Sequence, residues 1–144
     1  MRPEPAVTIA AARGCWGLPE VRHAGLVRWL PVDLVLVSVF AVIGRMSHAE
    51  AITVAGWWST AWPFLTGVLL GWAVVALTRR PGGSVRAGLV IWAATVIGGL
   101  LLRLVVDQGT AAAFVGVATL VLGLLLVGPR ALAAADWQRT PPVG

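Results

Sequence analysis

The sequence has few charged residues and contains neither lysine nor tyrosine. Charged residues make up 12% of its 144 positions and hydrophobic residues 58%, whereas soluble domains carry about 25% charged residues. A water-soluble domain of this size would need more polar surface than this. The eleven arginines outnumber the six acids, but they lie between long apolar runs instead of forming a basic stripe. This distribution argues against a nucleic-acid-binding protein, so we expect no nucleic-acid partner.

Cysteine and histidine are also scarce, which removes the common motifs of metal sites and of many enzymes. Cys15 is the only cysteine, and His23 and His48 are far apart in sequence. There is no Cys-x-x-Cys motif and no phosphate-binding glycine-rich loop. Ser47, His48 and Glu50 are sequence neighbours, which does not make them a catalytic triad. We therefore expect no metal, no cofactor and no enzyme; a membrane-surface enzyme is the third and unsupported interpretation.

Four apolar runs dominate the chain, each close to the roughly 20 residues that a helix needs to cross about 30 Å of hydrocarbon. They predict transmembrane helices at about 27–45, 57–77, 87–106 and 111–128, with Pro129 ending the last one. The expected fold class is an all-α integral membrane four-helix bundle of two helical hairpins, spanning residues 27–130. Residues 1–26 lack the apolar stretch of a signal peptide, and we interpret them as a flexible tail. Residues 131–144 form a second, short tail.

The arginines predict how the chain is oriented in the membrane. Arg79, Arg80 and Arg86 flank a Pro-Gly-Gly turn between the second and third runs. Short loops rich in basic residues stay in the cytoplasm, and four crossings place both chain ends on that same side. We therefore expect a cell-membrane protein, embedded in the lipid bilayer, with both termini cytoplasmic.

Six polar or aromatic residues are expected to gather at the outer ends of the helices as a candidate polar site. They are Arg45, His48, Trp62, Arg103, Asp107 and Thr110. One interpretation is a vestibule in which Arg45 and Arg103 bind an anionic or polar solute, with His48 changing charge near neutral pH. The alternative is anchoring, in which Arg103 pairs with Asp107 one turn away or reaches lipid phosphates, and Arg45 pairs with Glu50.

Three residues place polar groups at membrane depth inside the predicted helices. Asp33 lies one to two turns from the cytoplasmic boundary of the first helix, where an isolated charge costs several kcal/mol. We expect it to pair with Arg28 or Arg86; the alternative is a protonated carboxyl on a proton or cation path. Trp72 and Trp92 lie well inside their helices, where each indole N–H needs a partner.

Small residues recur at four-residue spacing along the second, third and fourth runs. Gly67 and Gly71, and Thr95 and Gly99, are examples. Such pairs allow helix backbones to approach closely in lipid, either within one subunit or between subunits. They support a rival role as an accessory or assembly subunit of a larger membrane complex. A transport path would need a homo-oligomer, because four helices enclose little space.

Several short motifs together resemble one known set. They are Gly44-Arg45-x-Ser47-His48, Thr60-Ala61-Trp62-Pro63-Phe64, Trp92-Ala93-Ala94-Thr95, and Leu102-Arg103 with Gly109-Thr110 and Phe114. On these motifs the chain resembles a family of small four-helix bacterial and archaeal membrane proteins known as a domain of unknown function, over roughly residues 27–130. The resemblance implies a fold and a location, and no substrate. The leading hypothesis is a membrane protein that transports or senses a small polar or anionic solute at the outer cluster.

Overall fold

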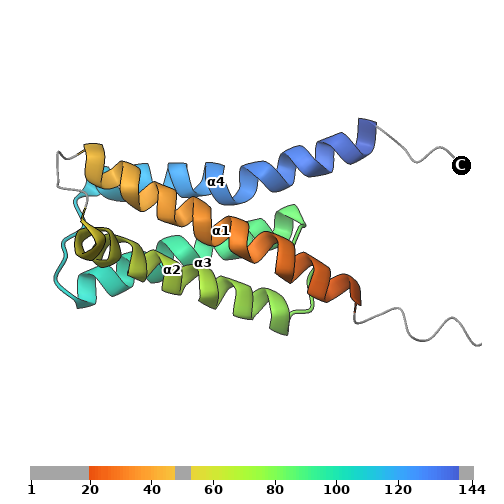
Figure 1. The fold of residues 1–144 in the computed structure, drawn as a ribbon, viewed down its shortest axis with the longest axis horizontal. Coiled ribbons are helices and arrows are strands. Elements are labelled where there is room, and N and C mark those ends of the chain that lie inside the picture. Colours follow the sequence, from red (N-terminus) through yellow and green to blue (C-terminus); the bar gives the residue numbers. More distant parts are fainter. Residues whose placement is uncertain (1–19, 48–52, 140–144) are drawn as a thin grey trace, which may run out of the picture.

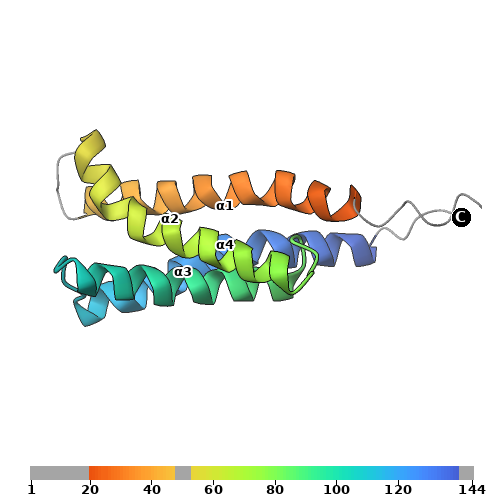
Figure 2. The same cartoon turned by 90° about the horizontal axis from the view of Figure 1, so that it is seen from below.

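Four α-helices make up the regular secondary structure of the residues that the computed structural model describes, 20–47 and 53–139. They are α1 (Glu20–Ser47), α2 (Val54–Leu77), α3 (Val85–Val105) and α4 (Ala112–Arg139). Successive helices run in opposite directions, and each packs against two neighbours, α1 and α3 both lying against α2 and α4 (Figure 1 and Figure 2). The predicted all-α four-helix fold is confirmed.

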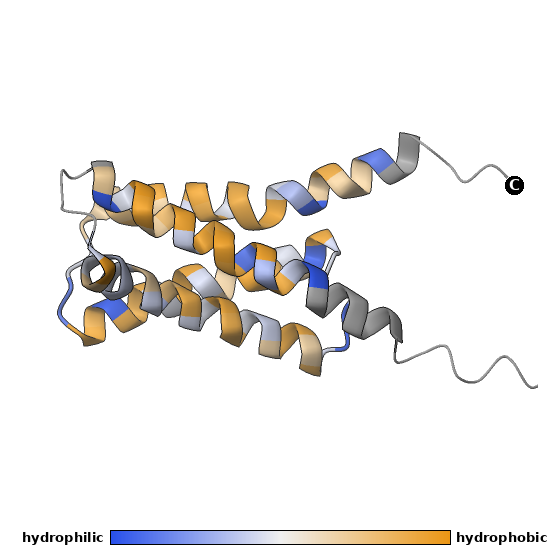
Figure 3. Cartoon of the chain, viewed as in Figure 1, coloured by the Kyte–Doolittle hydropathy of each residue, from blue (hydrophilic) through white to orange (hydrophobic). Residues whose placement is uncertain are grey.

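Each helix contains a stretch long and apolar enough to cross a membrane. The stretches are Arg28–Met46, Val54–Leu77, Val85–Val105 and Ala112–Asp136. Figure 3 shows hydrophobic residues along all four helices. Large apolar side chains such as Leu120 and Leu124 remain about three-quarters exposed, at 75% and 73%, which lipid tolerates and water would not. The chain is therefore a multi-pass membrane protein.

The two ends of the bundle differ, and we name them separately. The loop end holds the connection between α2 and α3, residues 78–84, together with the start of α1 and the end of α4 (Figure 1). The distal end holds the end of α1, the start of α2 and the turn between α3 and α4. Thr53 and Ser84 cap α2 and α3, each accepting a hydrogen bond from a backbone N–H of the first turn.

Two predicted helix boundaries were wrong. α1 begins at Glu20 instead of residue 27, and Pro31 lies in its interior. α4 passes through Pro129 and ends at Arg139 instead of 128. A proline removes one hydrogen bond, here to the carbonyl of Leu125, and bends a helix without necessarily ending it. Figure 1 shows the C-terminal part of α4 turning away from the other helices.

α2 and α3 approach most closely along a seam of small residues. A Cβ atom added at Gly67 would lie 2.7 Å from the Cα of Thr95, and one added at Gly71 would lie 2.7 Å from the Cα of Ile91. At Gly99 the ring of Phe64 fills the space that a side chain would need. The small-residue pairs of α2 and α3 thus pack within one subunit, which answers a question that their spacing leaves open.

The polar groups at membrane depth find partners inside the chain. The indole N–H of Trp72 donates to Asp33 Oδ2 at 2.9 Å, and that of Trp92 donates to the backbone carbonyl of Thr119 at 2.9 Å. Thr95 is buried and donates to the carbonyl of Ile91 in its own helix. The expectation that both indoles need an acceptor is confirmed.

Candidate functional site

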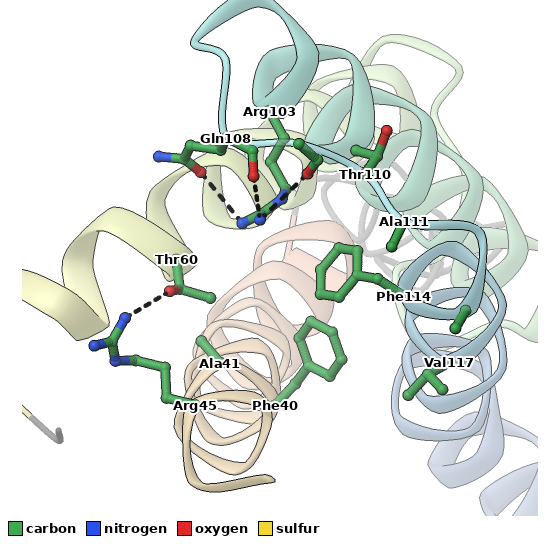
Figure 4. Close-up of a pocket in the computed structure, with 13 residues that line it drawn as sticks. Phe40, Ala41, Arg45, Thr60, Arg103, Gln108, Thr110, Ala111, Phe114 and Val117 are labelled. Carbon is green, nitrogen blue, oxygen red and sulfur yellow. Dashed lines mark hydrogen bonds between the residues drawn. The ribbon is translucent and has the colours of Figure 1, made fainter. Parts of the chain in front are cut away.

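A pocket of about 660 Å³ lies at the distal end of the bundle, between α1 and α4 and under the turn between α3 and α4 (Figure 4). Its lining residues come from all four helices and from that turn. They are Phe40, Ala41, Gly44, Arg45, Thr60, Arg103, Gln108, Gly109, Thr110, Ala111, Ala113, Phe114 and Val117. The α1 members and the α4 members each follow three- and four-residue spacing, so each helix presents one face to the pocket.

Arg103 is held in the pocket wall by the turn that follows its own helix. Its Nη1 donates to the side-chain carbonyl of Gln108 at 3.2 Å, and its Nη2 donates to the backbone carbonyls of Gln108 at 3.3 Å and Gly109 at 3.5 Å (Figure 4). The guanidinium carbon also lies 4.7 Å from the centre of the Phe114 ring, within the range of a cation–π contact. These contacts fix the direction in which the cation points.

Arg45 reaches the same pocket from α1. Its Nη1 donates to the hydroxyl of Thr60 on α2 at 3.4 Å. The neighbouring residue Ser59 accepts, through its backbone carbonyl, a bond of 3.1 Å from the side-chain amide of Gln108. Both arginines are therefore connected to adjacent residues of α2, Arg45 directly and Arg103 through Gln108.

Two arginines line this pocket. Within the described part of the chain its wall contains Arg45 and Arg103 and no aspartate or glutamate. Guanidinium groups suit carboxylate and phosphate oxygens in particular, so this wall offers donors to an anion.

The rest of the pocket wall is apolar and partly aromatic. Phe40 of α1 and Phe114 of α4 both project into the space between these helices (Figure 4). Each also packs on Phe64 of α2, with ring centres 5.5 Å and 6.2 Å apart respectively. The aromatic cluster therefore supports the pocket floor from the bundle interior.

A second polar cluster, buried near the loop end, joins α1 to α4. Asp33 and Arg130 are both 0% exposed and form a two-pronged ion pair, with Nη1 to Oδ1 at 2.9 Å and Nη2 to Oδ2 at 2.8 Å. Arg130 also donates to the backbone carbonyls of Gly82 at 3.0 Å and Leu126 at 2.6 Å. Trp72 supplies a further donor to Asp33.

Aromatic rings complete the surroundings of this buried ion pair. The guanidinium carbon of Arg130 lies 4.7 Å from the ring centre of Trp29 and 5.9 Å from that of Trp72. Bidentate pairing, two backbone carbonyls and adjacent rings satisfy both charges where water is absent. The arrangement has the character of a structural clamp between α1, α4 and the loop at residues 78–84.

The expected partner of Asp33 was wrong, although the expected pairing is confirmed. We predicted Arg28 or Arg86, and both are exposed to the surroundings of the bundle. Arg130 takes the position instead because α4 continues past Pro129 and carries it to the depth of Asp33. A helix ending at residue 128 would have left Arg130 beyond the end of that helix.

Residues 30–133, which include both clusters, match a family model whose description is protein of unknown function, DUF3054. The chain belongs to this family. No curated protein and no solved structure matches it. The match confirms the resemblance to a domain of unknown function, and the matched region extends from the pocket to both halves of the buried ion pair.

Membership of DUF3054 brings no assigned chemistry, so the site rests on where each predicted residue lies. Arg45, Arg103 and Thr110 line the pocket. Trp62 and Asp107 do not line it, and Asp107 is exposed at the turn. The hydrogen bonds seen for Arg103 go to Gln108 and Gly109 instead of the expected Asp107.

His48 and Glu50 lie outside the described residues, so their expected roles beside Arg45 stay predictions. In the described ranges, 20–47 and 53–139, no group of three His, Cys, Asp or Glu residues is placed to hold a metal ion.

Several pocket residues were missed because sequence gives no direct sign of which way an apolar helix face turns. Phe40 and Val117 belong to this group. Phe114 had a usable signal, since it lies in the first turn of α4, shortly after Thr110. Thr60 is likewise a polar residue in the first two turns of α2, at the same end as Arg45.

Proposed function

We propose that this DUF3054 membrane protein binds a small anionic or polar solute in the distal pocket and transports or senses it. The observation that carries the proposal is the convergence of Arg45 and Arg103 on one cavity from different helices. Membrane helices carry few charges, and those that line a cavity mark solute or ion sites. Anchoring to lipid alone would not require both cations to line the same cavity.

The rival role as an accessory subunit has less support than its sequence pattern indicated. Gly67 and Gly71 face the backbone of α3, and Gly99 faces Phe64, all within this chain. These small residues are therefore already occupied by internal packing. The face of α4 around Gly116, where an added Cβ would meet no atom within 4 Å, is the part of the pattern that still fits a partner.

We expect substitution of either pocket arginine by glutamine to weaken anion binding by about tenfold or more, because each removes a charge-assisted contact. Purified protein in lipid nanodiscs would be titrated with inorganic phosphate and with acetate by calorimetry, comparing Arg45→Gln and Arg103→Gln with the unchanged protein. Arg86→Gln, an exposed arginine at the loop end, is the matched control. Equal affinities in all four proteins would contradict the proposal.

Flux of the same anions into proteoliposomes separates transport from sensing. A protein that binds without flux would act as a sensor, and one with flux would be expected to form an oligomer in the lipid.

The proposed solute would come from outside the cell, because the arginine distribution predicts that the distal end faces outward. We expect Cys15 to resist a membrane-impermeant maleimide in intact cells and to react after lysis. In a Cys15→Ser background, a cysteine at Ala51, between α1 and α2 in sequence, is expected to react in intact cells. The reverse labelling pattern would invert the orientation and place the pocket in contact with the cytoplasm.

A further inference from the structure

We infer that the pocket's ligand is an amphiphile from the bilayer with one apolar chain and an anionic head. The head lies at Arg45 and Arg103, and the chain lies in the groove between α1 and α4. This inference rests on the proposed anion-binding function and names its ligand class. Three features of the pocket support it: its wall combines polar and apolar groups, it opens toward lipid, and its cationic side chains are guanidinium groups.

The pocket wall combines polar and apolar residues. Gln108 and Thr110 belong to the turn at the distal end, whereas Phe40 and Val117 lie inside α1 and α4. From Ala112, the first residue of α4, to Val117 the helix advances about 7.5 Å along its axis. A small hydrophilic anion would leave these apolar walls uncovered, and an apolar chain would remove them from contact with water.

The deeper part of the pocket opens sideways toward lipid. Val117 lines the pocket and is still 57% exposed, and a Cβ added at Gly44 would meet no atom within 4 Å. Nearer the loop end, the ion pair of Asp33 and Arg130 joins α1 to α4. The pocket is thus open toward lipid along the exposed side chain of Val117.

The two arginines of the pocket determine which head group it favours. Two guanidinium groups favour phosphate or carboxylate oxygens and repel an ammonium head. Phe114 already has a cation against its ring at 4.7 Å, namely Arg103. An aromatic cage for a cationic head would need that ring face, so the pocket is built for an anion.

The test uses the full chain in nanodiscs of zwitterionic phosphatidylcholine and four probes: octyl phosphate, inorganic phosphate, octanol and octyltrimethylammonium. Empty nanodiscs correct for partitioning into lipid. We expect octyl phosphate to bind at least about tenfold more tightly than inorganic phosphate, with no saturable binding of octanol or the cation. Inorganic phosphate binding as tightly as octyl phosphate would overturn the amphiphile inference and leave the proposed anion site intact. Absence of binding by both phosphates would contradict both proposals.

A matched pair of glycine substitutions tests where the apolar chain of the ligand lies. Gly44→Leu fills the lateral opening, whereas Gly116→Leu adds the same side chain on α4 outside the pocket; neither Cβ meets an atom within 4 Å. We expect the first to weaken octyl phosphate binding by about tenfold and the second by less than about twofold. Unchanged binding in Gly44→Leu would overturn the groove assignment.

A second pair of substitutions tests the same groove even if Gly44→Leu fails to fold. Val117→Ser and Leu120→Ser both alter exposed apolar residues of α4, and only Val117 lines the pocket. Weaker octyl phosphate binding in Val117→Ser alone would support the groove, and equal effects would count against it.

Discussion

Asp33→Leu is expected to lower the free energy of unfolding by about 3–5 kcal/mol, because it leaves a buried guanidinium without its counter-charge. Arg130 is 0% exposed and bonded to both carboxylate oxygens. The other acceptors of Arg130, the carbonyls of Gly82 and Leu126, carry no net charge. Equilibrium unfolding in mixed micelles, followed by tryptophan fluorescence and circular dichroism, would measure the change.

The double variant Asp33→Leu with Arg130→Met provides the decisive control. Removing both charges together avoids the isolated charge, so we expect the double variant to regain about half of the lost stability or more. The indole N–H of Trp72 then lacks its acceptor, which costs about 1–3 kcal/mol and prevents full recovery. Arg86→Met, at an exposed arginine, is expected to change little. A loss in Asp33→Leu no larger than in Arg86→Met would refute the clamp.

Gly67→Ala is expected to destabilise the protein by about 1–3 kcal/mol through overpacking of the seam between α2 and α3. The new Cβ would lie 2.7 Å from the Cα of Thr95 and 3.0 Å from its carbonyl oxygen, and backbone atoms cannot move aside as a flexible side chain can. The same unfolding experiment measures the loss, and the two helices would have to separate to accommodate the methyl group.

The matched substitution Gly116→Ala should have the opposite sign. Its Cβ would meet nothing within 4 Å, and alanine is favoured over glycine inside a helix by about 0.5–1 kcal/mol. If both substitutions changed stability equally, helix propensity would explain the effect and the close seam would not.

The sequence predicts the helices of this protein well because apolar run length has a direct physical counterpart, the thickness of the bilayer. It predicts their ends less well. Pro129 is read as a helix stop on local grounds, but packing and the buried charge of Arg130 hold the helix together beyond it. The wrong boundary also led to the wrong partner for Asp33. The pair forms only because α4 continues past Pro129, and its two residues are 97 positions apart in the sequence.

The candidate site was predictable in its charges and not in its walls. Topology alone brings Arg45, Arg103 and Thr110 to one end, because helices one and three end where helix four begins. Which face of each helix turns inward depends on packing rotations that an evenly apolar helix does not encode. For that reason only the structure shows that Phe40 and Val117 line the pocket and that Trp62 does not.

The long separation between Asp33 and Arg130 has a consequence for how the protein is made. During synthesis α1 enters the membrane before α4 has been made, so Asp33 is for a time without the arginine that neutralises it. During that interval its charge favours a position near the lipid head groups. The first helix therefore gains its neutralising partner only when the last helix arrives, and a chain truncated before residue 130 would lack that partner.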